Sequence, residues 1–103
     1  MFEKYIKNKT KNNFQLLLNE TIDIIENICK QSESPLYLNI LHQLYDMKEN
    51  VIEVELFTGW DDINERYSIG GLAVKNFSEG NDIRNRLCAL FGGAMDYLDY
   101  PDL

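Results

Sequence analysis

VIEVELF, residues 51–57, is the stretch on which the fold prediction depends. Three apolar residues alternate here with Glu53 and Glu55, and a period of two is typical of a strand with one buried face. We therefore expect a β-strand over Val51–Phe57. Its two glutamates would share the opposite face, which favours contact with water or with a partner.

A second apolar segment, Arg66–Phe77, follows the polar stretch Thr58–Glu65. Its Gly70-Gly71 pair indicates a bulge, or a place where another backbone comes close. The simplest arrangement of Val51–Phe57 and Arg66–Phe77 is an antiparallel hairpin with a long tip.

Helices are expected before and after this hairpin in the chain, packed on one face of the sheet. Apolar residues recur at spacings of three and four over Asn12–Gln31, which predicts an amphipathic helix. Ser34-Pro35 is a helix-start signal, so a second helix is expected over Pro35–Met47. The apolar residues from Ile83 to Leu98 predict a third helix, which Gly92-Gly93 weakens by roughly 1 kcal/mol per glycine.

The sequence thus predicts one α+β domain over residues 1–103, with three helices packed on a short antiparallel β-sheet. Two strands make a thin sheet. Either a third strand lies within Met1–Thr10 or around Leu36–Leu41, or a partner covers the open face.

Charge is the main indication of function. Beyond Lys11, sixteen carboxylates face six Lys and Arg residues, a net charge of −10. Such a surface repels nucleic acid and anionic membranes and speeds association with a basic protein. Lysines cluster only in the segment before Phe14, where contact with the acidic surface or a role in solubility is the simplest interpretation.

Catalytic and metal-binding patterns are missing from the sequence. The single histidine, His42, lies on a predicted helix, and an enzyme that uses Cys88 or His42 is the least favoured alternative. The chain has no C-x-x-C, H-E-x-x-H or EF-hand pattern, and its glycine pairs do not lie between a strand and a helix. We predict no catalytic residue, no metal and no cofactor.

Candidate partner-binding residues come from three places: the glutamates of the first strand, the hairpin tip and the C-terminal segment. The last two combine acids with large aromatic residues, as expected where an anchor fills a pocket and carboxylates pair with Lys or Arg. The predicted residues are Glu53, Glu55, Trp60, Asp61, Asp62, Glu65, Asp96, Tyr97, Asp99 and Tyr100.

The N-terminal residues carry no apolar secretory signal, and no apolar run approaches the roughly 20 residues that cross a bilayer. We expect a cytoplasmic protein. In that reducing compartment Cys29 and Cys88 would be two buried thiols rather than a disulfide.

A short, acidic, Asn/Ile/Lys-rich single domain without a catalytic motif resembles the small bacterial immunity proteins, particularly those of contact-dependent growth inhibition systems. The resemblance implies binding to a cognate toxin. A basic nuclease domain would have its substrate groove covered by the acidic surface, with no direct contact to nucleic acid. The alternative is an adaptor or regulatory domain that forms a homodimer through its sheet edge.

Overall fold

The computed structural model describes residues 9–55 and 59–102, and all the regular structure in them is helical. The α+β prediction is therefore wrong, and no part of the described chain forms a strand. The elements in chain order are α1 (Lys11–Gln31), α2 (Pro35–Met47), the π-helix η2 (Lys48–Glu53), α3 (Trp60–Arg66), α4 (Ile69–Asn76), α5 (Asp82–Met95) and the 3-10 helix η3 (Tyr97–Asp99).

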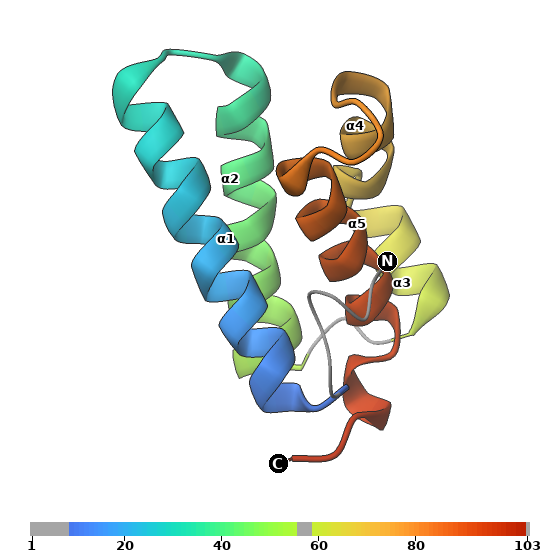
Figure 1. Ribbon diagram of the computed structural model, residues 1–103. Helices are drawn as coiled ribbons and strands as arrows, with labels where there is room; N and C mark the ends of the chain where they lie inside the picture. The colour runs from blue at the N-terminus through green and yellow to red at the C-terminus, as the bar shows by residue number, and fades with distance from the viewer. Residues whose placement is uncertain (1–8, 56–58, 103) are drawn as a thin grey trace.

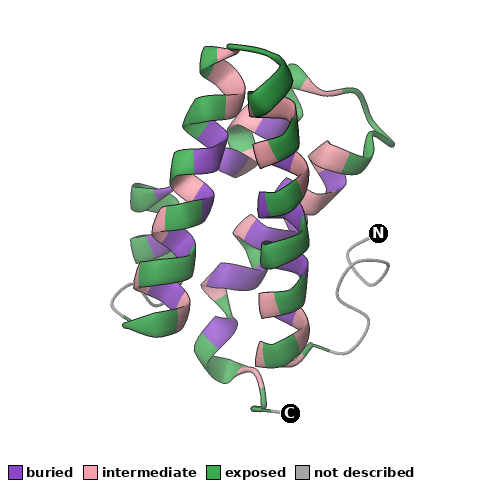
Figure 2. Cartoon of the chain, turned by 90° about the vertical axis from the view of Figure 1, so that its left-hand side faces the viewer, coloured by how far each residue is buried: buried purple, intermediate pink, exposed green. Residues whose placement is uncertain are grey.

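Helices α1 and α2 form an antiparallel hairpin, and α5 packs on α1, with α3 and α4 against α5 (Figure 1). The residues coloured as buried lie on the helix faces that turn toward the inside of the bundle (Figure 2). They form a single hydrophobic core that takes residues from every helix from α1 to α5. The start of α1, η2 and η3 lie together at the lower end of the bundle in Figure 1.

The two helices predicted before Met47, which form the α1–α2 hairpin, are confirmed. The first begins one residue earlier than predicted, at Lys11, because the Thr10 hydroxyl accepts a hydrogen bond from the Asn13 amide at 3.1 Å. The second has Pro35 in its first turn, although the Ser34 side chain makes no capping hydrogen bond. No described helix is long and apolar enough to cross a membrane.

The predicted first strand is wrong because α2 continues beyond Met47. Its buried stripe runs through Ile40, Leu44 and Met47 and reaches Val51 at the same spacings of three and four. The Val54 amide donates to the Glu49 carbonyl at 2.9 Å, the five-residue step of a π-helix. Val54 is 59% exposed, so the alternation of apolar residues does not mark a buried face. Residues 56–57 lie outside the described residues.

The predicted second strand is also wrong. Helix α3 takes in the tip residues from Trp60 onward and the first residue of this segment, Arg66, and most of the remainder forms α4. Ile69 and Ala73 are buried four residues apart, which is helical spacing. The third predicted helix exists as α5, but it ends at Met95, before Leu98.

The two neighbouring glycines of α4 have opposite surroundings. A Cβ atom at Gly70 would lie 2.7 Å from Cδ2 of Phe91, so this glycine allows α4 and α5 to pack closely; a Cβ at Gly71 would meet nothing within 4 Å. The close neighbour is a side chain rather than the backbone approach that the sequence suggested.

Alanine substitutions at these glycines should therefore have opposite effects. We expect G71A to raise the free energy of unfolding by about 0.5–1 kcal/mol, since alanine favours the helix. G70A has the same intrinsic advantage but forces the Phe91 ring to move. It should therefore lower the free energy of unfolding by about 1 kcal/mol. Urea denaturation of both variants measures the difference, and equal effects would contradict the packing.

Cys29 and Cys88 are free thiols, as predicted, but both are half-buried rather than buried. Burial raises the pKa of the Cys88 thiol, which disfavours its reactive thiolate. His42 is exposed on α2. Among the described residues, no group of three or more His, Cys, Asp or Glu side chains is placed to hold a metal ion.

Candidate partner-binding surface

Helix α3 displays most of its side chains to solvent. Ile63 is its one buried residue, whereas the Trp60 side chain is 62% exposed. Four of the predicted binding residues lie on this helix, all exposed, and together we call them the α3 surface: Trp60, Asp61, Asp62 and Glu65. Because the fold leaves the largest aromatic side chain of the chain exposed, that side chain is available for contact with a partner.

Local sequence explains why α3 begins at Trp60. Gly59 precedes it with φ of +86°, a conformation that favours glycine. Asp61 and Asp62 lie in the first turn, where negative charge interacts favourably with the positive end of the helix dipole. The acids thus contribute to forming α3 as well as to its surface charge.

The end of α3 is fixed to α2 by hydrogen bonds around Asp46. The Arg66 guanidinium donates to both oxygens of the Asp46 carboxylate, from Nε at 3.1 Å and from a terminal nitrogen at 2.5 Å. The Tyr67 hydroxyl donates to the same carboxylate at 2.7 Å. We call Asp46, Arg66 and Tyr67 the Asp46 network; it holds α3 at a defined position on the bundle.

The network shifts the ionisation of its members in opposite directions. The hydrogen bond from Arg66 lowers the pKa of Asp46, so the carboxylate stays ionised at neutral pH. Burial, together with the hydrogen bond to Asp46, raises the pKa of Tyr67, so its hydroxyl stays protonated and continues to donate. Both states preserve the attachment of α3.

A second group of predicted residues lies at the lower end of the bundle. Lys11 connects them: its Nζ lies 3.2 Å from Oδ1 of Asp102 and 3.9 Å from Oε1 of Glu55. It also lies 5.6 Å from the centre of the Tyr97 ring. The hydrogen bond with Asp102 raises the pKa of Lys11. The structure thus brings Glu55 and the C-terminal segment together, although Tyr97 and Asp102 lie 42 and 47 positions after Glu55 in the chain.

We call this region the acidic end. It has three lysines, Lys9, Lys11 and Lys48, and twice as many exposed carboxylates, which belong to Glu49, Glu53, Glu55, Asp96, Asp99 and Asp102. Carboxylates are also in excess on the rest of the described surface. Charge therefore makes the whole molecule attractive to a basic partner and does not by itself select one contact region.

The two predicted tyrosines serve the core more than the surface. Tyr97 is only 3% exposed; its ring lies 5.2 Å from that of Phe14, and its hydroxyl accepts a hydrogen bond from Gln15 at 2.7 Å. Tyr100 is half-buried beside it, with ring centres 6.5 Å apart. These rings leave little apolar area for a partner, in contrast to Trp60.

The sequence did not point to the side chains that support these surfaces. Asp46 and Gln43 lie among apolar residues of α2, three residues apart, and both bond to the segment after Glu65. Lys11 was assigned to a basic cluster without a specific contact. The only available signal was an acid on α2 together with an arginine at the end of α3, which is too common a pair to be diagnostic.

Comparison of the chain with protein-family models, with curated proteins and with solved structures finds no match. The functional argument therefore depends on the chain's own residues and contacts.

Proposed function

We propose that this chain is an inhibitor that binds and neutralises a basic toxin domain, as small bacterial immunity proteins do, and that the toxin is a nuclease. The α3 surface is the observation that carries the proposal, because it combines an exposed tryptophan with three exposed carboxylates on one short helix. Tryptophan is the residue type most enriched among the energetic anchors of protein interfaces.

The net charge of the chain indicates the class of protein that it would bind. A chain with a net charge of −7 repels phosphate groups and is attracted to the positive groove in which a nuclease holds its substrate. Carboxylates of the inhibitor would then occupy positions that phosphates occupy in the substrate complex. Inhibition is steric and electrostatic and requires no reaction by this chain.

The acidic end is a second predicted contact region. Glu53, Glu55, Asp96 and Asp99 expose their carboxylates there. The exposed apolar side chains of this end are Val54, 59% exposed, and Leu98, 43% exposed, and Val and Leu are under-represented among interface anchors, whereas Trp is enriched. We therefore assign it to long-range attraction and place the anchor on α3. The homodimer alternative lacks its sheet edge, because the described parts of the chain contain no strand.

A growth experiment tests the function. We expect the gene immediately upstream to encode a large exported protein with a basic C-terminal domain. Production of that domain alone should arrest growth, and co-production of this chain should restore it. A neighbouring gene without such a domain, or continued growth arrest in the presence of the folded chain, would contradict the proposed function.

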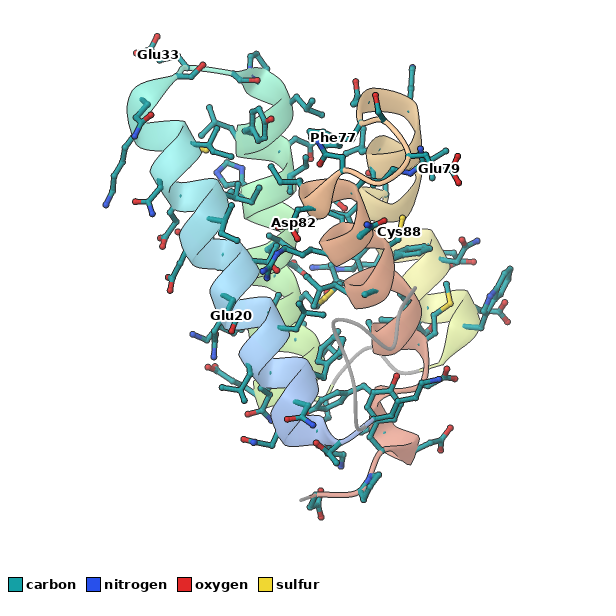
Figure 3. The ribbon with its side chains drawn as sticks, viewed as in Figure 1. Glu20, Glu33, Phe77, Glu79, Asp82 and Cys88 are labelled. Carbon is teal, nitrogen blue, oxygen red and sulfur yellow. The ribbon has the colours of Figure 1, made fainter. Side chains whose placement is uncertain are left out.

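Charge reversal tests which surface binds. The variant D61K/E65K changes α3, and E33K/E79K makes the same change in net charge at exposed positions on the upper loops, Glu33 and Glu79 (Figure 3). We expect the association rate with the purified toxin domain to fall about tenfold or more for D61K/E65K and clearly less for E33K/E79K. Equal losses would show that net charge acts without a preferred surface.

The same kinetic measurement has an internal control. The wild-type association rate should fall about tenfold as ionic strength rises from about 0.01 to 0.15 M, since the Debye length shrinks from about 30 to 8 Å. A thermal melt of D61K/E65K checks that α3 survives the loss of an acid in its first turn, which costs about 0.3–1 kcal/mol.

A further inference from the structure

A pocket of about 400 Å³ lies beside the α3 surface, between α2 and the end of α3. Its volume falls within the range of small-molecule sites. Every described residue that lines it carries a polar group: His42, Gln43, Asp46, Glu65, Arg66 and Tyr67. A ligand of this pocket must therefore be recognised by hydrogen bonds and charge.

Hydrogen-bond donors in the pocket are largely directed at the protein's own acceptors. The Gln43 side-chain nitrogen donates to Asn39 at 3.0 Å and to Ser68 at 2.9 Å, and its oxygen accepts from the Ser68 amide at 2.7 Å. The Tyr67 hydroxyl and two nitrogens of Arg66 donate to Asp46. These bonds define the walls of the pocket and satisfy the Asp46 carboxylate.

Two acceptors remain for a ligand. The carboxylate of Glu65 and the imidazole of His42 are exposed, and neither has a partner within the described residues. With His42 neutral, the formal charge of the lining is −1, because Asp46 and Glu65 together outweigh Arg66. A ligand that donates several hydrogen bonds and carries positive charge fits this set.

We propose that the pocket receives one arginine side chain of the basic partner, which pairs with Glu65 and donates to His42. A guanidinium suits the site better than an ammonium group, because its planar fork can give two bonds to one carboxylate and a third to a neighbouring acceptor. The proposal rests on the proposed function and adds to it: the partner would approach α3 from the side that faces α2.

Nuclear magnetic resonance tests the pocket without the partner. The isotopically labelled chain is titrated with Nα-acetylarginine amide at millimolar concentrations, and Nα-acetyllysine amide is the comparison. We expect saturable changes in chemical shift centred on His42, Glu65 and Arg66, with the arginine derivative binding more tightly. The variant E65Q should weaken this binding at least tenfold, while E79Q, which removes an exposed acid between α4 and α5, should leave it unchanged.

Two outcomes would contradict the proposed arginine site. One is a set of non-saturating shifts spread over all the acidic residues, and the other is equal binding by wild type and E65Q. Comparison with the toxin complex separates the two proposals. If the toxin domain binds wild type and E65Q equally, the pocket fails and the proposed function stands; if the arginine derivative binds as expected while no basic domain does, the proposed function fails.

Discussion

Replacing Phe14 with alanine is expected to lower the free energy of unfolding by about 3–5 kcal/mol, the largest stability effect that we predict. Phe14 is fully buried in α1 and its ring packs on that of Tyr97, so truncation leaves a cavity where α1 meets the C-terminal segment. Domains of this size have only about 5–15 kcal/mol of stability. Chemical denaturation followed by circular dichroism gives the loss directly.

The matched control is L16A, two residues away on the same helix. The Leu16 side chain is 52% exposed, and we expect its removal to change the free energy of unfolding by no more than about 0.5 kcal/mol. Similar losses in F14A and L16A would mean that α1 does not bury the face described. The melting temperature of F14A should fall by at least about 12 °C.

W60A is expected to weaken the complex with the toxin domain by about 2–4 kcal/mol, which corresponds to roughly 30-fold or more in Kd. Trp60 is 62% exposed in the unbound chain, so its burial by a partner would provide most of the apolar contact on the α3 surface. The free energy of unfolding should barely change, because the substitution removes little buried area. Isothermal titration calorimetry measures the affinity.

V74A is the control for Trp60. Val74 is an apolar residue of similar exposure, 56%, and lies on α4 rather than on α3. It should bind the toxin domain as the wild type does. Normal affinity of W60A would remove the anchor and leave electrostatics alone to account for binding. Weak binding by both variants would indicate a broader apolar interface that includes α4.

Much of the helical framework was predictable from spacing alone. The apolar residues of α1, α2 and α5 recur every three or four positions over at least three turns, which outweighs other patterns. The failures lie in short segments. Over Val51–Phe57 an alternation only a few residues long suggested a strand, whereas the stripe that begins at Ile40 extends to Val51 and marks a continuing helix.

The short helices α3 and α4 could not be predicted for a different reason. Neither buries more than two of its own residues, so each depends on tertiary contacts with α5 and α2 rather than on its own periodicity. Gly70-Gly71 disfavours an isolated helix, but the close approach of Phe91 requires a glycine at the first of these positions. Local preference and the packed structure point in opposite directions here.

The predicted binding residues were also identified only in part from the sequence. The acidic candidates were identified from charge alone, and all seven of them lie on the surface. Sequence could not separate the aromatic residues, since Trp60 and Tyr97 have similar acidic neighbours. Only the packing of Tyr97 against Phe14 shows that one ring belongs to the core while the other faces solvent.

Trp60 is the only tryptophan in the chain. Its indole fluorescence therefore reports on one short helix, without any chemical label. Because the ring is already hydrated in the folded chain, its emission changes little on unfolding, but it should move to shorter wavelength when a second protein covers it. The chain thus carries its own optical probe of complex formation, located where the anchor is proposed to lie.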